Sequence, residues 1–455
     1  MRRLTPLDSL FLMLERRHQP LHVGALMLYE LPEGAGPNFV AELAERLRRS
    51  TQAASPFNRR LENKVGVRYW ADDNHFDIAH HFVHLALPSP GRIRELLTMA
   101  SRVHSAHLDR AYPLWRTYLI EGLEDGRIAT YSKIHHALVD GVAGMRLMMK
   151  SMSPDMAQSM QMPPPWEVKT RKSRQSALPI PNPSASSMDA MRALAGEGVR
   201  AFPGLAKAFK DTWADLRHKH PDLVHSVQAP RCILNQKITG SRRFAAQSYA
   251  TARIKGVAKR FGATANDVIM GMVGGALRAY LGELNELPDR PLVAAVPVSL
   301  RRDDSESGNQ VAFALSSLAT DVDDAARRLQ VIKNCMDYNK ARLSQLSPGQ
   351  IAAFGAAFLM PGVLSMVSGM GRNTAFNTVI SHVPGPRRDL YWQGCKLTGM
   401  YPVSIVTDGI ALNFTLISRH DFVDFGLIAC RKTLPHVQRL LEHLENELAA
   451  LEKAA

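Results

Sequence analysis

The sequence predicts an α/β fold of two halves joined by a long crossover segment. Strand-like and helix-like segments follow one another through residues 1–152, and a second such series begins at residue 231. Between them, residues 153–230 are rich in proline, serine and basic side chains, which is typical of a linker. For 455 residues a prior of roughly 150 residues per domain gives about three domains, but large α/β units often reduce that number to two.

Three segments of the first half are identified by their hydrophobic pattern. Leu21–Tyr29 is apolar enough for a buried strand, and Phe39–Arg49 has the spacing of an amphipathic helix. Arg127–His135 alternates between two faces, which predicts a strand that ends at a pair of histidines.

The crossover 153–230 is predicted to end in one or two helices. It contains Pro163-Pro164-Pro165-Trp166 and the basic run Lys169–Arg174, and apolar residues then recur at helical spacing through positions 205–216. We expect this apolar stripe to dock on a domain. Contact with a membrane is the alternative, because basic amphipathic helices suit lipid interfaces.

The second half is predicted from the same periodicities. The expected helices are Thr264–Leu281 and a last helix that begins at Pro435. The expected strands are Phe244–Ile254, Leu292–Leu300, Thr378–Ser381, Leu412–Ile417 and Phe422–Cys430.

The composition limits the classes of partner. The chain has 56 Lys and Arg against 42 Asp and Glu, and the formal net charge of +14 suits nucleic acid, an anionic lipid surface or an anionic substrate. Nucleic acid is the least favoured, because the basic residues are spread along the chain and no recognition signature is present. The four cysteines form no CxxC pair, which favours a reducing compartment and argues against a structural zinc site.

One apolar segment is about long enough to span a membrane, namely Ile351–Met370. Pro361, three glycines and two serines interrupt it, so we expect a buried helix and turn instead. The N-terminus has no apolar core of the length that a signal peptide requires.

The sharpest local feature is His135-His136-Ala137-Leu138-Val139-Asp140-Gly141. Adjacent residues of an extended segment point to opposite faces, so only one of the two histidines can address a given cleft. A neutral imidazole there is a good general base, because its ordinary pKa is about 6.5. Asp140 can hold the turn through a salt bridge or backbone hydrogen bonds, and Gly141 permits a sharp exit into a helix. A purely structural histidine pair explains the pattern equally well.

The sequence lacks the residues that other kinds of catalytic or binding site require. The histidines at positions 75, 80, 81 and 84 could suggest a metal site, but alternation places some of them outward on a strand, and no carboxylate or cysteine completes a tetrahedral set. We therefore expect no metal. No GxSxG elbow, GxxxxGK[ST] phosphate loop or GxGxxG helix start occurs. The spacing His135-x4-Asp140 also resembles that of membrane glycerolipid acyltransferases, which usually carry clear membrane segments.

Several short motifs occur in order along nearly the whole chain. They are Leu7-Asp8 with Pro20–Gly24, Pro113-Leu114-Trp115, His135–Gly141, Asn266-Asp267-Val268, Asn309-Gln310-Val311 and Val383-Pro384-Gly385-Pro386, the last preceded by His382 where asparagine is usual. In these motifs the chain resembles the bacterial wax ester synthase/acyl-CoA:diacylglycerol acyltransferases. That family belongs to the HHxxxDG superfamily, with chloramphenicol acetyltransferase and peptide condensation domains.

The resemblance implies two chloramphenicol-acetyltransferase-like domains with an active-site tunnel at their interface. Residues 1–152 would carry HHxxxDG, 153–230 would be the crossover linker, and 231–455 would carry the ND motif. The implied reaction moves a long-chain acyl group from acyl-CoA directly to a fatty alcohol, with diacylglycerol as a secondary acceptor. Acyl-CoA is a substrate, and we expect no cofactor, because thioester alcoholysis needs only a base and an oxyanion donor.

The resemblance also implies where the protein works and with what. We expect a cytoplasmic protein that associates peripherally with the inner face of the membrane and with lipid inclusions, and that binds no nucleic acid. The oligomeric state is not predicted. Two other functions stay open: an acyltransferase that acts mainly on diacylglycerol or another hydroxyl acceptor, and a catalytically inactive lipid-binding relative.

Carried onto this sequence, the motifs assign four catalytic residues. His136 would be the general base, Asn266 would donate to the oxyanion from a helix N-terminus, and Asp140 would orient the turn. His135 would be the fourth residue of this catalytic group. The alternative for Asn266 is that it only helps to start a helix, because Thr264 and Asp267 have the spacing of a capping box.

A second set of residues is expected to support the site or to bind the chains of the substrates. Gly141, Pro113, Trp115 and Asp267 would support the site. Ala352, Gly355 and Ala356 would line an apolar channel, since small side chains on one helical face leave room beside the helix. Close helix packing in an ordinary core explains these small residues as well.

Overall fold

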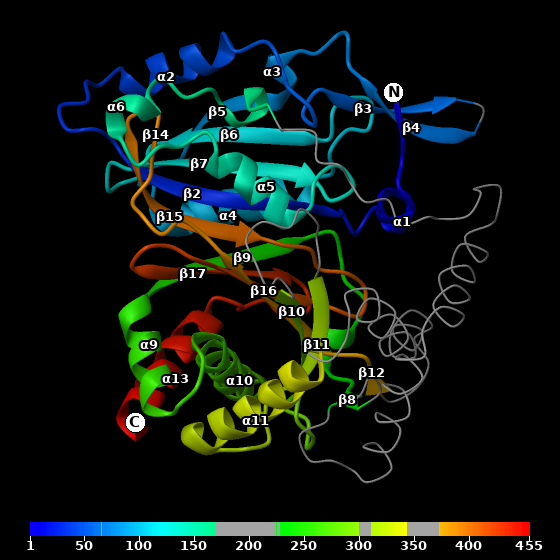
Figure 1. Ribbon diagram of the computed structural model, residues 1–455, viewed down its shortest axis with the longest axis vertical. Helices are drawn as coiled ribbons and strands as arrows, with labels where there is room; N and C mark the ends of the chain where they lie inside the picture. Colours follow the sequence, from blue (N-terminus) through cyan, green and yellow to red (C-terminus); the bar gives the residue numbers. More distant parts are fainter. Residues whose placement is uncertain (65, 170–223, 225–227, 300–310, 344–372) are drawn as a thin grey trace.

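The computed structural model describes residues 1–64, 66–169, 224, 228–299, 311–343 and 373–455. Two six-stranded sheets stack one above the other along the long axis of the molecule, and helices cover the outer side of each (Figure 1). This arrangement confirms the predicted α/β fold of two halves.

The first sheet has the strand order β14-β15-β2-β7-β6-β5, and only the β5–β6 pair is parallel. Its strands are β2 (His22–Glu30), β5 (Phe82–Ala86), β6 (Trp115–Glu121), β7 (Ile128–His135), β14 (Tyr391–Trp392) and β15 (Cys395–Val403). The central strand β7 is buried on both faces. Ile128 and Ile134 pack in the cluster that holds α2 (Phe39–Arg48) and α5 (Gly141–Met149), while Ala129 and Tyr131 pack on the α4 (Ile93–Ser105) side.

Two strands of this sheet come from the C-terminal part of the chain. β15 pairs antiparallel with β2, and β14 pairs with β15. The linker's first residues also pack on this half, because the side chain of Trp166 is 1% exposed in its apolar cluster. The boundaries at residues 152 and 231 stay predictions, and the strand exchange shows that the two halves are not independent in sequence.

The second sheet has the order β11-β10-β13-β16-β17-β9, in which β10–β13 and β13–β16 are parallel. Its strands are β9 (Arg242–Ala250), β10 (Val293–Ser299), β11 (Val311–Ser317), β13 (Thr378–Pro384), β16 (Leu412–Ser418) and β17 (Phe422–Cys430). Two small sheets, β1-β4-β3 and β12-β8, complete the described strands: β1 (Arg2–Arg3), β3 (Arg59–Lys64), β4 (Val67–Asp72), β8 (Ala229–Pro230) and β12 (Asn373–Thr374).

The helices of the second half gather on the outer side of its sheet (Figure 1). They are α9 (Thr251–Arg260), α10 (Ala265–Glu283), α11 (Ala325–Leu343) and α13 (Arg439–Ala454). α10 is buried almost all around, because α9, α11 and α13 contact it on its sides. The first half has α1 (Pro6–Leu14), α3 (Ile78–His81) and α6 (Met156–Ser159) besides α2, α4 and α5, and short 3₁₀ turns lie at Pro165–Glu167 and Ile233–Asn235.

The two halves meet through a shared apolar core. Leu26 and Leu96 of the first half pack in one cluster with Phe244, Val403 and Ile428. At its rim the backbone N–H of Arg242 donates to Ser105 Oγ at 3.0 Å, and the Arg242 guanidinium, 3% exposed as a residue, donates to the His18 carbonyl at 2.8 Å.

Two predicted boundaries are wrong, and of the histidines expected to include strand residues only His84, in β5, is on a described strand. The strand Phe244–Ile254 ends at Ala250, where α9 begins without a capping side chain that the sequence could have revealed. Pro435 opens a turn, and the last helix begins only at Arg439. The histidines at 80 and 81 lie in α3 rather than on a strand, because Asp77 Oδ1 accepts from the Ala79 N–H at 2.9 Å and caps a helical turn.

The apolar segment 351–370 lies outside the described residues, as does the predicted helical stripe at 205–216. Among the residues that the structure describes, no helix is both long and apolar enough to cross a membrane.

Candidate active site

The HHxxxDG segment lies where β7 ends and α5 begins. His135 is the last residue of β7 and is paired with His22 of β2. His136 follows in a turn, and its backbone N–H donates to the Leu21 carbonyl at 2.9 Å. The residue before β2 therefore anchors the backbone of the turn that carries the His136 ring.

Both ring nitrogens of His135 face a partner. The residue is 1% exposed, and its Nδ1 accepts the Ala137 N–H at 3.1 Å. An accepting Nδ1 places the ring proton on Nε2, which lies 3.4 Å from Glu15 Oε1. At that distance Nε2 is not counted as hydrogen-bonded among the described residues, and what sets His135 apart is its near-complete burial and the carboxylate that faces it.

The ring of His136 has a different environment. It stacks on Phe11 of α1 at a centroid distance of 4.2 Å, and its Nδ1 is buried without a hydrogen-bond partner among the described residues. Burial lowers the pKa of His136, and the negative charge of Asp140 and the histidine's own backbone oppose that shift only in part. The neutral imidazole, which a general base requires, is favoured at neutral pH.

Glu15 is a buried acidic residue of this site that the sequence did not reveal. Its side chain is 5% exposed and accepts from Arg110 Nη2 at 2.7 Å and from the Leu21 N–H at 3.2 Å, with His107 Nδ1 at 3.4 Å. Burial would raise the pKa of Glu15, but hydrogen bonds from His135 and Arg110 outweigh it and lower the pKa to about 2. A carboxylate of fixed charge therefore stands behind His135.

Asp140 and Gly141 form the start of α5. Asp140 is the N-cap, and its Oδ1 accepts the Ala143 N–H at 2.8 Å, one of the backbone contacts that the sequence suggested. The expectation that Gly141 is needed for a sharp exit into the helix is wrong. Its φ is not in the left-handed region, and a Cβ at this position would meet open space, so neither conformation nor packing requires glycine here.

Pro113 and Trp115 lie beneath the histidine turn. The His135 backbone N–H donates to the carbonyl of Leu114, between them, at 2.9 Å. Trp115 is 2% exposed, donates from Nε1 to the Phe57 carbonyl at 2.8 Å and stacks on His81 at 4.5 Å. These contacts fit the expected role of support for the site.

Asn266 and Asp267 lie in the first turn of α10, in the other half. Asp267 is fully buried, and its Oδ2 accepts from the Thr264 N–H at 2.8 Å and from Thr264 Oγ1 at 2.7 Å, in the capping box that the sequence predicted. Asn266 is half-buried. Within the described residues, no hydrogen bond, ion pair or ring contact joins Asn266 to either catalytic-motif histidine, so its role stays a prediction.

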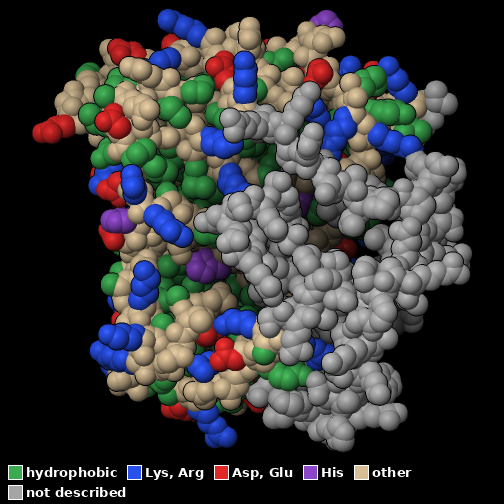
Figure 2. All heavy atoms as spheres, viewed as in Figure 1, with side chains coloured by type: hydrophobic (Ala, Val, Ile, Leu, Met, Phe, Trp, Pro, Cys, Tyr) green, Lys and Arg blue, Asp and Glu red, His purple; other side chains and the backbone are tan. Residues whose placement is uncertain are grey.

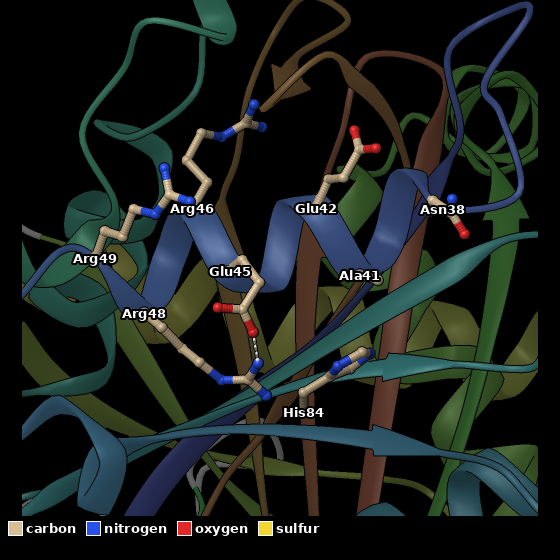
Figure 3. Close-up of a pocket in the computed structure, with 8 residues that line it drawn as sticks. All are labelled: Asn38, Ala41, Glu42, Glu45, Arg46, Arg48, Arg49 and His84. Atoms are coloured by element: carbon tan, nitrogen blue, oxygen red, sulfur yellow. Dashed lines mark hydrogen bonds and ion pairs between the residues drawn. The ribbon is translucent and has the colours of Figure 1, made fainter.

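Two surface pockets lie elsewhere. One, of about 590 Å³, is formed by α2 and His84 of β5; Glu45 points to Arg48 within it, and Arg46 and Arg49 lie together near the C-terminal end of the helix (Figure 3). The other, of about 240 Å³, is lined by Pro113, Trp115, Arg116 and neighbouring residues. Neither is lined by His136. The predicted channel residues Ala352, Gly355 and Ala356 lie outside the described residues.

The histidines that could have suggested a metal site are dispersed by the fold. His81 Nδ1 lies 2.9 Å from the Trp115 carbonyl, His80 stacks on Tyr112, and His84 Nε2 is 3.0 Å from Glu121. The described part of the chain has no group of three or more His, Cys, Asp or Glu side chains placed to hold a metal ion.

Two stacked α/β halves with an HHxxxDG turn between a central strand and a helix form the two-domain fold shared with condensation domains. Comparison with known proteins makes this specific. The model of the wax ester synthase/diacylglycerol acyltransferase catalytic domain matches residues 4–269, and that of the WS/DGAT C-terminal domain matches residues 307–452. The chain belongs to the wax ester synthase/diacylglycerol acyltransferase family and is an O-acyltransferase.

Individual relatives agree along the full length. The chain is 45% identical to the O-acyltransferase WSD of Acinetobacter baylyi over 99% of this chain and 97% of that protein. It is 43% identical to a putative diacylglycerol O-acyltransferase of Mycobacterium bovis, over 99% of each.

Solved structures give the same result. The wax ester synthase/diacylglycerol acyltransferase of Marinobacter aquaeolei VT8 matches with a TM-score of 0.80 at 43% identity, covering 100% of this chain and 99% of that one. A condensation domain of the calcium-dependent antibiotic synthetase matches with a TM-score of 0.59 at 16% identity, over 99% of this chain and 95% of that one, which shows the shared fold alone.

Proposed function

We propose that the protein transfers a long-chain acyl group from acyl-CoA to a fatty alcohol, which yields a wax ester, and that it acylates diacylglycerol as a second acceptor. The names of the relatives support both acceptors, since one with a solved structure is a wax ester synthase/diacylglycerol acyltransferase and another is a putative diacylglycerol O-acyltransferase. The basic charge of the chain suits a substrate that carries the phosphates of CoA.

In the proposed mechanism His136 acts as the general base. Its neutral ring takes the hydroxyl proton of the alcohol as the oxygen attacks the thioester carbonyl. The resulting oxyanion accepts from the Asn266 amide, aided by the N-terminal dipole of α10. Collapse breaks the carbon–sulfur bond, and the CoA thiolate takes the proton back from His136. The acyl group passes directly to the alcohol, and no metal or redox cofactor takes part.

The observation that supports this assignment most is the difference between the two neighbouring histidines. The ring nitrogens of His135 face Ala137 N–H and Glu15, whereas the His136 ring contacts Phe11 and has a lowered pKa. A ring that its surroundings keep neutral is suited to accept a proton. His135 and Asp140 orient it.

We further propose that the protein works in the cytoplasm, at the inner face of the membrane and on lipid inclusions. Its substrates carry long alkyl chains, and the net charge of +14 favours anionic lipid surfaces.

Parallel assays with purified protein test the function. Palmitoyl-CoA is offered with hexadecanol, with a diacylglycerol, or with neither, while CoA release and lipid products are followed. We expect product with both acceptors and faster turnover with hexadecanol. CoA release without any ester, or no CoA release at all, would contradict the proposal. Faster turnover with diacylglycerol would instead indicate an acyltransferase that acts mainly on diacylglycerol.

A further inference from the structure

Helix α1 contacts the proposed base on one side and exposes large apolar side chains on another. Phe11 stacks on His136, and Leu12, 2% exposed, packs with Leu114 and Ala137. Leu10, Met13 and Leu14 are 49%, 61% and 43% exposed. Their spacing of three and four residues places these three side chains on one face of the helix, which we call the outer face of α1.

Apolar exposure is concentrated here. Eleven large hydrophobic side chains are exposed among the described residues, and four of them, Met1 and the three of the outer face, lie within the first 14 residues. Scattered single apolar residues are ordinary on a protein surface, whereas a group of neighbours indicates a surface that contacts something apolar.

The charges around the outer face are basic. Arg2 and Arg3 precede the helix, Arg16 and Arg17 follow it, and all four are exposed. The acidic residues of the same segment point inward: Asp8 Oδ2 accepts from Thr5 N–H at 3.1 Å and from Trp70 Nε1 at 3.3 Å, and Glu15 is buried behind His135. Arg16 Nη1 lies 3.9 Å from Asp408 Oδ2, whose side chain is partly exposed. Within the segment itself, the charges that face solvent are positive. Figure 2 shows basic side chains next to hydrophobic ones at the upper right, over β3 and β4; Trp70 of β4 packs with Leu12 of α1.

We infer that the outer face of α1, with the arginines at both ends of the helix, is the surface by which the protein docks on an anionic lipid membrane. The inference rests on the proposed peripheral association and assigns it to a place. Apolar side chains on one face with basic residues around them are the composition of an interfacial helix, and each basic residue near an anionic leaflet strengthens binding. Docking here would place the lipid surface against the same helix whose Phe11 contacts His136, so that α1 would connect the membrane surface to the wall of the active site.

Vesicle flotation tests the inference. The full chain is mixed with vesicles of phosphatidylcholine and about one third phosphatidylglycerol, and compared with the triple variant Leu10→Ser, Met13→Ser, Leu14→Ser. The vesicle-bound fraction should fall about ten-fold or more, because three apolar side chains no longer enter the interface. The matched control Leu284→Ser removes a side chain that is 38% exposed between Glu283 and Asn285, and it should bind like the unchanged protein.

Activity assays of the same variants provide a second test. The triple variant should keep its activity on a short-chain alcohol dissolved in water to within about two-fold. It should lose activity on diacylglycerol presented in vesicles in proportion to its lost binding. A third variant, Met13→Trp, should show fluorescence that brominated lipids quench beyond the signal of the native tryptophans. Arg3→Glu with Arg17→Glu should weaken binding further and reduce its dependence on salt.

The outcomes separate the inference from the function on which it rests. If the triple variant floats like the unchanged protein, if Leu284→Ser loses as much binding, or if Met13→Trp is not quenched, the outer face of α1 is not the docking surface. A change of oligomeric state in the triple variant, measured by light scattering, would assign this face to a second copy of the chain and overturn the inference. If the unchanged protein does not float but acylates dissolved alcohols, the peripheral association fails while the acyl transfer stands.

Discussion

The histidine end of the first sheet and the core around α10 in the second differ in what surrounds their buried polar groups. Around α10 most buried side chains are apolar, such as Val273 and Leu277 at 0% exposure, and a few charges are buried with partners, such as Asp267 in its capping box and Arg328 beside Glu447. At the histidine end, ionisable side chains are buried next to one another: His22 is paired with His135, and His104 of α4 packs edge-on against His22.

Each of these polar groups has a partner that makes its burial tolerable. Lys133 Nζ donates to the Val103 carbonyl at 2.9 Å and to the Ala106 carbonyl at 2.6 Å, and burial lowers its pKa to about 7. His104 Nδ1 lies 2.6 Å from the Tyr131 hydroxyl, and His22 Nε2 lies 2.8 Å from the His104 carbonyl. The comparison indicates that apolar packing dominates around α10, whereas at the histidine end hydrogen bonds orient a group of buried ionisable side chains near the reaction.

The largest expected effect separates the two regions by function. His136→Ala should lower acyl transfer by about 10²- to 10⁴-fold, the usual contribution of a positioned base, with little change in melting temperature. Leu277→Ala should do the reverse: it removes a fully buried side chain at a cost of about 2–5 kcal/mol and should leave turnover per folded molecule nearly unchanged. Steady-state assays and thermal melts of both variants make the measurement. His135→Ala should lose less activity than His136→Ala; equal losses in two folded variants would show that the base is misassigned.

Asn266 is the residue through which the second half would take part in the chemistry. Asn266→Ala should lower turnover by about 10²-fold and change KM less, because an oxyanion donor acts mainly in the transition state. The control is Thr264→Ala, which removes the capping hydroxyl of the same helix and should cost about 1 kcal/mol of stability while turnover is kept. Equal turnover losses in both variants would mean that Asn266 only helps to start α10.

Lowering the pH should destabilise the histidine end of the first sheet first. Burial, followed by the charges of Lys133 and Arg242, lowers the pKa of His104 to about 3 from an ordinary 6.5. The unfolded chain therefore binds a proton there that the native protein refuses, so the stability from this group is complete above pH 6.5 and is lost as the pH falls toward 3. The pKa of His22 is shifted in the same direction.

The corresponding measurement is the melting temperature between pH 7 and pH 4. It should fall in the unchanged protein and fall less steeply in His104→Gln, although that variant should be less stable at pH 7 because it disturbs contacts to Tyr131 and Ser404. Parallel curves for the two proteins would rule out His104 as a source of the acid sensitivity.

The smallest effect concerns two aspartates that cap helices in the same way. Asp140 accepts the Ala143 N–H at 2.8 Å, and Asp155, at the start of α6, accepts the Gln158 N–H at 2.7 Å. Asp140→Ala and Asp155→Ala should each cost about 1 kcal/mol of stability, but only Asp140→Ala should also lower activity, because its turn carries His136. An Asp140 variant with a normal melting temperature and no activity would instead indicate that Asp140 takes part directly in the reaction.

The parts of the fold that could be predicted have local signals. β17 has the predicted bounds Phe422–Cys430, β7 was identified by alternation, and the capping box of Thr264 and Asp267 marked the start of α10. The N-terminus of α9 carries no capping side chain, so strand and helix could not be separated there from the sequence.

The parts that could not be predicted depend on residues far apart in the chain. Glu15 precedes two arginines and has no local mark of burial; its partners come from positions 107, 110 and 135. The motif could indicate that one of two histidines acts as a base, but the orientation of His135 by Glu15 is visible only in the folded protein. Gly141 illustrates the opposite error, since the conformational reason for a glycine does not apply there.

The pairing of β15 with β2 bears on how the protein can be made and divided. Because β15 covers one edge of β2, the sheet that carries His135 stays open until the ribosome has synthesised residue 403. A nascent or truncated chain that lacks Cys395–Val403 would present β2 as a bare edge strand, which readily pairs with other chains. The N-terminal half should therefore aggregate when it is expressed alone, and it should become soluble when a separate C-terminal fragment that contains β15 is supplied during synthesis.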